Sequence, residues 1–373
     1  MTSTADGRRP LPRGLLILLG LAAAVIALGG MRSAAGIIGP VFLALVLTIA
    51  VHPMRGYATR LGAPPWAGTL VGIITVYVVL LLLATSLVVA VARFATLMPT
   101  YATEFNELLQ DGLETLASYG VSRDQINDIT SSFDVSQAVS VAGSALSSVL
   151  SLTSNLLFVI TLLLFMGMDA AHVPAKLEDS RDERPAVVEA LSSFAVGTRR
   201  YIVVSTVFGF IVAVLDTVFL AFTPVPVPLL WGLLAFITNY IPNIGFVIGL
   251  VPPAILGLLE GGPWLMALVI AVYSLLNFAI QSVIQPKFVG DSVGLSGTLT
   301  FLSLIFWAWV LGPLGALLAV PLSLLVKAML VDVDPASHWL TRLLAGESAD
   351  KAPPASPQQP PRTPPKAPAT EPA

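Results

Sequence analysis

The stretch "FITNYIPNIGFVIGLVPP", Phe236–Pro253, interrupts a long apolar segment with two asparagines, three prolines and two glycines. Proline removes a backbone donor and clashes with the preceding helical turn. In lipid an unsatisfied backbone group is costly, because no water is present to bond to it. The stretch therefore predicts a membrane helix that is broken where a break is least favourable, and it raises the question of what the break is for.

Composition places this break in a membrane protein. Of the 373 residues, 55% are hydrophobic and 11% are charged, whereas a soluble domain averages about 25% charged residues. Several uncharged apolar runs reach the length that crosses a bilayer as a helix. We predict an all-α polytopic membrane protein with about eight membrane segments, two of them broken or re-entrant, and a helical insert between segments three and four.

Several features of catalytic sites are missing from the sequence. The chain has no cysteine, so disulfides, thiolate nucleophiles and thiolate metal sites are excluded. It contains no GxxxxGK[ST] phosphate-binding loop and no HExxH. The histidines His52, His172 and His338 lie far apart in the sequence. We therefore expect no enzyme, no cofactor and no metal site.

Two apolar runs are too long for one crossing. Pro228–Leu259 and Thr298–Val331 both exceed the roughly 20 residues that span a bilayer. The first is interrupted near its middle by "NYIPNIG", Asn239–Gly245, and the second by "VLGPLG", Val310–Gly315. A pair of Gly/Pro-interrupted hydrophobic segments is the best sequence indication of a transporter binding site. The alternative is a pair of kinked helices whose breaks serve packing alone.

A helix break leaves backbone groups that a solute can use. It exposes carbonyls on one side and amides on the other, so it can coordinate a cation or attract an anionic or hydroxylated group. The polar side chains near the first break are mostly uncharged, which suits a small polyhydroxylated solute or a dehydrated cation better than a lipid. The candidates for substrate binding or gating are Thr238, Asn239, Pro242, Asn243, Gly245, Gln281, Gln285, Gly312, Pro313 and Gly315.

Asp216 is the only acid well inside a predicted span, the apolar run Tyr201–Phe222. An acid within a membrane helix is a functional hypothesis by default, because it is costly there. Asp216 could carry a proton or bind sodium, so it is the candidate for ion coupling. A structural acid that faces a polar neighbour or the outer interface is the alternative.

The sequence divides into five regions. Apolar residues at helical spacing between acids predict the insert, the loop 169–200 mixes charges of both signs, and the tail is too rich in proline to bury a core. The regions are the first three transmembrane helices at 1–92, the amphipathic helical insert at 93–147, helices four and five with a charged loop at 148–222, the broken-helix transport region at 223–331, and a cytoplasmic, mostly disordered tail at 332–373.

Lysines and arginines orient the chain. With a cytoplasmic N-terminus and five single spans, only Arg32, Arg93 and Arg123 fall outside, whereas every other basic residue up to Arg200 falls inside. This positive-inside bias predicts that both termini are cytoplasmic.

The breaks also predict how the two long segments fold. Because each is broken near its middle, we expect hairpins folded at Pro242 and Pro313 that enter from opposite faces and meet near the midplane. The turn at 260–263 would then lie outside and the loop at 285–297 inside. Two long, kinked single spans would exchange these locations.

Three motifs follow one another over roughly the last third of the membrane region: "NYIPNIGFVIGLVPP", "QPKFVGDSVGLSG" and "LGPLGALLAVPLSLLVKAML". Together they resemble the autoinducer-2 exporter family, also called PerM-like permeases. The resemblance implies an integral membrane protein that forms a homo-oligomer, and it adds Pro286 to the candidates for binding or gating. The positions that match the family pattern are Pro242, Gly245, Pro252, Pro286, Gly290, Gly294, Leu295, Gly312, Gly315 and Pro321.

The resemblance implies export of a small furanone-like signal and, in other members, exchange of sodium or lithium for protons. We predict a secondary transporter of the bacterial cell membrane that exports a small polar solute such as an autoinducer-2-like molecule. A sodium(lithium)/proton antiporter is one alternative, although residues 280–282 lack the acid that some relatives carry there, and Gly297 stands where many have proline. A non-transporting membrane scaffold is the other. The expected partners are membrane lipid, a small polar solute or monovalent cation, and further copies of the chain, with no nucleic acid.

Overall fold

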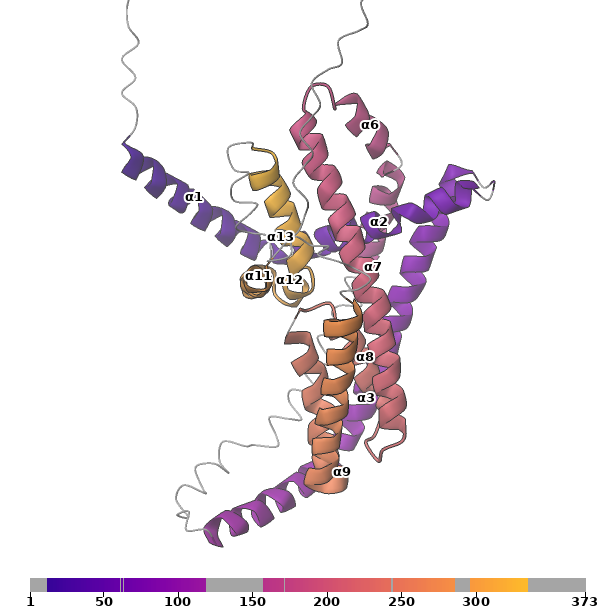
Figure 1. Ribbon diagram of the computed structural model, residues 1–373, viewed down its shortest axis with the longest axis vertical. Coiled ribbons are helices and arrows are strands. Elements are labelled where there is room, and N and C mark those ends of the chain that lie inside the picture. The colour runs from indigo at the N-terminus through magenta and orange to yellow at the C-terminus, as the bar shows by residue number, and fades with distance from the viewer. Residues whose placement is uncertain are drawn as a thin grey trace, which may run out of the picture.

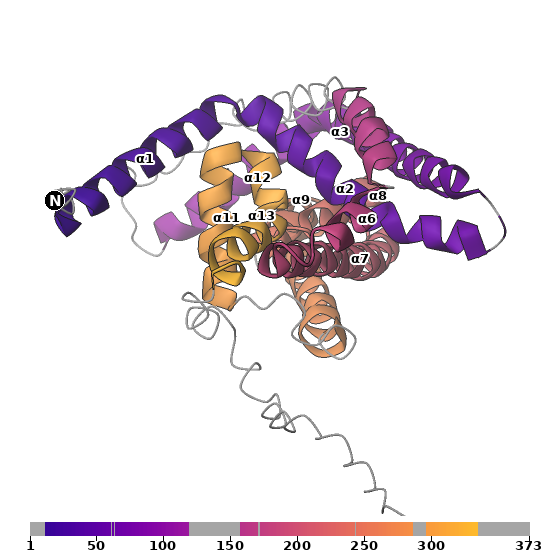
Figure 2. The ribbon, with the colours of Figure 1, turned by 90° about the horizontal axis from the view of Figure 1, so that it is seen from above.

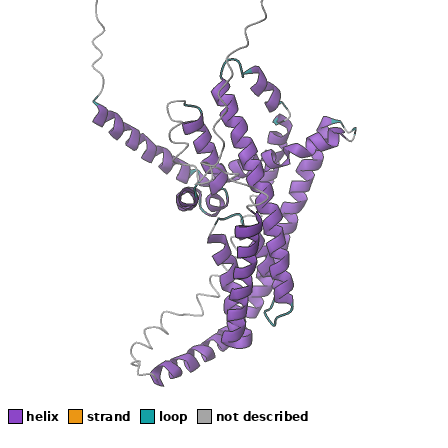
Figure 3. Cartoon of the chain, viewed as in Figure 1, coloured by secondary structure: helices purple, strands orange, loops and turns teal. Residues whose placement is uncertain are grey.

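The computed structural model describes residues 12–60, 62, 64–118, 157–170, 172–242, 244–285 and 296–334. Within these ranges every regular element is a helix, as Figure 3 shows, which agrees with the predicted all-α class. Asn243, Pro286, residues 119–147 of the predicted insert and the tail beyond 334 lie outside the described residues.

Three helices form the N-terminal part. They are α1 (Arg13–Ser33), α2 (Ala35–Arg60) and α3 (Pro65–Ser118). α3 is 54 residues long, so it would extend on the order of 80 Å at 1.5 Å per residue. The predicted third span and the first part of the predicted insert are therefore one continuous helix.

The next segment contains more helix than expected. A helix at Leu157–Asp169 is followed by the short α6 (Val173–Asp179) and by α7 (Pro185–Ala221). α7 was expected to begin near Tyr201, but it begins at Pro185, a residue that suits the first helical position. Its early turns bury Ala190 and Phe194 in an apolar cluster. Residues 185–200 of the predicted loop are therefore an extension of α7, while residues 180–184 form an exposed turn.

The first broken segment is a helical hairpin. α8 (Pro228–Thr238) and α9 (Ile244–Asn277) are separated by the predicted break. A β-carbon on Gly245 would overlap the carbonyl oxygen of Thr238, and one on Gly249 would lie 3.4 Å from Cα of Ala235. The residues nearest the break on the two helices face each other, and so do the residues farther from it. The two helices therefore run antiparallel.

α9 itself bends back on its length. Its backbone leaves helical geometry at Gly261 and at Gly262, which has a φ of 70° that favours glycine. Beyond this turn the chain returns along the first part, since a β-carbon on Gly257 would lie 3.4 Å from Val269. We call Ile244–Glu260 the first arm and Pro263–Asn277 the second arm. The second arm continues into the π-helix η1 (Phe278–Ile284).

The second broken segment also folds back. α11 (Gly297–Leu311), α12 (Pro313–Leu317) and α13 (Ala319–Lys327) follow one another, and the π-helix η2 (Ala328–Asp332) ends the described chain's regular structure. Gly312 makes the turn with a φ of 68°. In Figure 1 α11 and α12 are seen end-on beside each other, while α13 rises away from them.

The tips of the two hairpins share one apolar cluster. Tyr240, Ile241 and Ile244 from the first tip pack against a core that includes Leu311 and Leu318 of the second. The view from above in Figure 2 places α11, α12 and α13 over the end of α9, in agreement with this contact. The tips of the two hairpins are therefore in apolar contact, while their entry from opposite faces of the membrane stays a prediction.

Length and hydropathy single out four helices within the described residues that could cross a membrane, or five if Leu157–Asp169 and Val173–Asp179 form one bent span. One of the four, Ile244–Ile284, is the segment folded at Gly261 and Gly262. A polytopic membrane protein agrees with this result, while the expected number of about eight segments stays a prediction.

Candidate functional site

A small cavity lies at the first helix break, where α7, α8, both arms of α9 and η1 converge. Its volume is about 10 Å³, on the order of the space that one water molecule requires. The residues that line it are Val212, Asp216, Ala235, Thr238, Asn239, Gly245, Phe246, Gly249, Tyr273, Asn277 and Gln281.

The structure brings several predicted site residues together around this cavity. Its lining includes the acid expected in the fifth span and four of the residues proposed at the first break and beyond: Asp216, Thr238, Asn239, Gly245 and Gln281. Pro242 is half-buried at the hairpin tip, and Gln285 is half-buried one turn beyond Gln281; neither lines the cavity. Asn243 and Pro286 lie outside the described residues.

A chain of amide hydrogen bonds crosses one side of the cavity. Nδ2 of Asn239 donates to the carbonyl oxygen of Ser205 on α7 at 3.0 Å. Nε2 of Gln281 donates to Oδ1 of Asn239 at 2.8 Å and to Oδ1 of Asn277 at 2.7 Å. The side chain of Gln281 therefore joins the hairpin tip to the π-helical segment.

The hairpin tip is also fastened to α7. The hydroxyl of Tyr201 donates to the carbonyl oxygen of Tyr240 at 2.7 Å, and the hydroxyls of Thr206 and Tyr240 are 2.7 Å apart. Gly209 leaves room for Asn239, whose Nδ2 would lie only 2.7 Å from a β-carbon at that glycine. The break is thus held against α7 by several polar contacts and close packing.

Two polar side chains in the cavity wall have no partner. Asp216 is 0% exposed and Tyr273 is 1% exposed. Among the described residues, neither the carboxylate oxygens of Asp216 nor the hydroxyl of Tyr273 has a hydrogen-bond partner. Buried polar groups are nearly always paired, and a buried charge needs a partner even more. The two groups therefore leave binding capacity that is available to a water molecule, an ion or a solute.

Tyr273 and Asn277 belong to the lining but were not among the predicted residues. Each lies one helical turn before the next polar residue, in the series Tyr273, Asn277, Gln281. Residues four apart share a helix face, so extending the predicted Gln281–Gln285 face backwards would have found both. Nδ2 of Asn277 donates to the carbonyl oxygen of Tyr273 at 3.1 Å.

The second break contributes nothing to this cavity. A β-carbon on Gly315 would overlap the carbonyl oxygen of Trp307, Pro313 is exposed, and Gly312 is half-buried. The polar groups behind this break satisfy one another: Ser303 donates to the carbonyl oxygen of Ala319 at 3.1 Å, and Nε1 of Trp307 donates to Oγ of Ser323 at 3.1 Å. Gly312, Pro313 and Gly315 therefore stay gating predictions, separate from the cavity.

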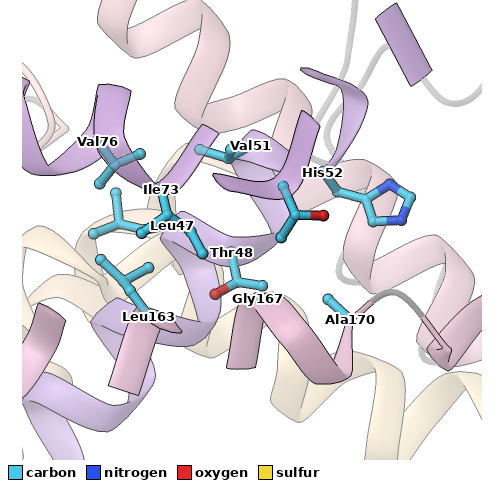
Figure 4. A pocket seen from close by; sticks show the side chains of 10 residues that line it. Leu47, Thr48, Val51, His52, Ile73, Val76, Leu163, Gly167 and Ala170 are labelled. Carbon is cyan, nitrogen blue, oxygen red and sulfur yellow. The ribbon is translucent and has the colours of Figure 1, made fainter. Parts of the chain in front are cut away.

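A second, larger pocket lies elsewhere, between α2, α3 and the helix Leu157–Asp169. Figure 4 shows its lining, which is mostly aliphatic and includes Leu47, Ile73 and Leu163. Its volume is about 30 Å³. Thr48, one of its polar residues, donates to the carbonyl oxygen of Ala44 at 2.7 Å. Its apolar lining and the absence of an acid from it favour the smaller cavity as the functional site.

The chemistry that the smaller cavity offers is binding rather than bond cleavage. It combines one carboxyl group, one phenol and several amides and carbonyls, which can bind hydroxyl groups, hold a proton or coordinate a small cation. No group of three or more His, Asp or Glu side chains that could hold a metal ion occurs among the residues that the structure describes.

Comparison with known proteins identifies the family of this chain. The family described as "AI-2E family transporter" matches residues 15–333. The AI-2 transport protein TqsA of Escherichia coli (strain K12) is 30% identical over 317 residues, which cover 85% of this chain and 92% of that protein. The putative transport protein YhhT of the same strain is 29% identical over 349 residues, 92% of this chain and 99% of that one. A putative transport protein of Haemophilus influenzae is 28% identical over 322 residues, covering 84% and 91% of the two chains. The chain belongs to the AI-2E transporter family of bacterial multi-pass membrane transporters, and it is not an enzyme.

Proposed function

We propose that this chain is a secondary transporter that exports a small polar solute, and that the cavity around Asp216 is its transport site. The observation that carries the proposal is the fully buried, unpartnered carboxyl group of Asp216 beside a helix break. A broken helix at membrane depth is tolerated where it lines a cavity or is buried in protein, and this break does line one.

An AI-2-like molecule is the solute that we propose. The name of the relative TqsA, an AI-2 transport protein, supports this choice. The cavity wall supports it as well, because carboxyl, phenol and amide groups match the hydroxyl groups of a small polyhydroxylated molecule. Apart from Asp216 the wall is uncharged, so it favours a neutral solute over a polyanion.

The cavity is too small for such a solute in this conformation. With a volume of about 10 Å³ it holds roughly one water molecule, so a solute can enter only after part of the wall moves. This agrees with alternating access, in which a site near the midplane opens to one side at a time. We propose that both termini are cytoplasmic and that the chain works as a homo-oligomer.

Flux into vesicles tests the proposal. The purified full-length protein is reconstituted in liposomes, and uptake of labelled AI-2 is followed with an imposed proton gradient, with a sodium gradient, and with neither. We expect gradient-dependent AI-2 accumulation in vesicles that contain the protein and none in empty vesicles. Equal AI-2 flux in both kinds of vesicle would overturn the proposed solute.

A sodium(lithium)/proton antiporter is the second candidate, and the lone acid Asp216 favours it. A carboxyl group that alternates between a proton and a cation is sufficient for such exchange. The same vesicles distinguish the two functions if the internal pH is followed while sodium or lithium is added without AI-2. Proton movement in the absence of AI-2 supports the antiporter. Proton movement that occurs only when AI-2 is added supports the exporter.

A further inference from the structure

The wall of the cavity consists of a fastened side and a loosely held side. The fastened side is α7 with the hairpin tip, which Tyr201, Thr206 and Asn239 join by hydrogen bonds. The early part of the second arm is fastened too, because Val269 and Tyr273 lie in a large apolar cluster and are 0% and 1% exposed.

The loosely held side is η1, which follows the second arm. Ile280 is the one buried residue of this segment. Ile280 packs in a small cluster with Phe208 and Val212 of α7. The only other attachment to the fastened side that the described residues provide is the hydrogen bond from Gln281 to Asn239.

The backbone of η1 is suited to a change of register. A π-helix holds one residue more per hydrogen-bonded turn than an α-helix, and such turns are found most often at functional sites. Return to α-helical bonding would rotate the following side chains by about 100° around the axis. The side chain of Asn277 bonds to the carbonyl oxygen of Tyr273 at the start of this segment, a local contact that competes with the backbone hydrogen bonds of the helix.

From these contacts we propose that η1, Phe278–Ile284, is the gate of the cavity, and that the hydrogen bond between Gln281 and Asn239 is the latch that keeps it too narrow for the solute. The proposal rests on the transport function proposed for this cavity. When the latch breaks, η1 moves away from α7 while α8 and the hairpin tip stay in place. The cavity then opens along the line of Asn277 and Gln281 and exposes Asp216 and Tyr273 to the solute.

Cysteine labelling tests the gate without any transport assay. The chain contains no native cysteine, so Val212→Cys places one thiol in the cavity wall, where the native side chain is 2% exposed. A small methanethiosulfonate reagent is applied to the full-length protein in liposomes, with Gln281 intact or changed to Leu. The matched control is Ser282→Leu, at an exposed position of the same segment and outside the cavity lining.

We expect Gln281→Leu to raise the labelling rate at position 212 at least about fivefold, which corresponds to the loss of one ordinary hydrogen bond. Ser282→Leu should leave the rate within about twofold, since it removes no latch. Equal rates in the two variants would overturn the gate, whether or not the vesicles transport AI-2. A raised rate together with no AI-2 flux in the native protein would leave the gate standing and overturn the proposed function.

A cross-link provides the second measurement. In vesicles that transport, Asn239→Cys with Gln281→Cys is joined by a short bifunctional thiol reagent whose linkage a reductant cleaves. Flux should stop on cross-linking and return on reduction, while either single cysteine variant should be insensitive to the cross-link. Flux that continues in the cross-linked protein would show that η1 does not have to separate from the hairpin tip.

Discussion

The two broken segments look alike in sequence but differ in what they enclose. Both fold back at a Gly/Pro break, and in both a glycine, Gly245 or Gly315, allows backbone to touch backbone. The first break surrounds a cavity with the unpartnered Asp216 and Tyr273. Behind the second, Ser303, Trp307 and Ser323 bond to one another. A helix break is therefore a way to turn the chain, and it becomes a site only where polar groups are left unpaired.

The π-helical segments differ in the same sense. η1 is attached to the first hairpin by one side-chain hydrogen bond, from Gln281 to Asn239. η2 buries Ala328 and Val331, and its last residue, Asp332, pairs with Lys327 at 3.1 Å. We expect movement at η1 and a fixed position for η2.

The largest expected difference is topological and all-or-none. If the hairpins enter from opposite faces, Glu260→Cys reacts with a membrane-impermeant thiol reagent in intact cells and Asp291→Cys does not. Asp291 lies outside the described residues, and its location follows from the positive-inside orientation. The reverse labelling pattern would mean that each segment crosses the membrane as one long span. The hairpins seen in the structure would then not be re-entrant in the membrane.

Asp216→Asn should have the next largest effect. We expect gradient-driven flux to fall by at least about a hundredfold, since asparagine keeps the shape of the side chain but cannot exchange a proton or pair with a cation. The control is Glu189→Gln, an exposed acid on the same helix, which should leave flux unchanged. Full coupling in the Asp216 variant would remove this acid from the mechanism.

Both hairpins should depend equally on their tight glycines. Gly245→Ala and Gly315→Ala each force a β-carbon into a carbonyl oxygen, so each should lower the free energy of unfolding by about 2–3 kcal/mol. Gly297→Ala meets nothing within 4 Å and is the control. Thermal unfolding of the purified protein measures the difference, and a neutral Gly245→Ala would contradict the fold-back at the first break.

The two breaks should respond differently to loss of a polar side chain. Asn239→Leu should lower flux about tenfold while leaving assembly intact, because it removes the latch and part of the cavity wall. Ser323→Ala should lower the free energy of unfolding by about 1 kcal/mol and leave flux unchanged, because its partners are structural. Flux and unfolding are measured for both variants, and exchange of the two outcomes would mean that the second break is the functional one.

Much of this fold could be predicted from the sequence because the helix breaks contain glycine and proline, which have strong backbone preferences. Gly261–Gly262 separates the two arms of α9, and it falls within the turn that the sequence predicts at 260–263, directly after the segment Pro228–Leu259. The start of α7 could not be predicted in the same way. The charged residues before Arg200 read as a loop, but Ala190 and Phe194 gain burial against elements far away in the sequence.

The site was predictable in part for a similar reason. Asp216 and Asn239 stand out as polar groups in apolar surroundings, and they line one cavity. The sequence did not indicate which of the two breaks would enclose a cavity. At the second break Ser323 bonds to Trp307, whereas at the first break no described residue bonds to Asp216. Pairing between side chains far apart in the chain is a property of the packed structure rather than of local spacing.

Protection of single cysteines by the solute tests the central claim, that the first break and not the second is the transport site. Thr238→Cys lies in the cavity wall, and Pro313→Cys lies at the second break, where the proline is exposed. Labelling rates with a small thiol reagent are compared with and without AI-2, for full-length protein in liposomes. We expect AI-2 to slow labelling at position 238 several-fold and to leave position 313 unchanged. Protection at 313 with none at 238 would contradict the account.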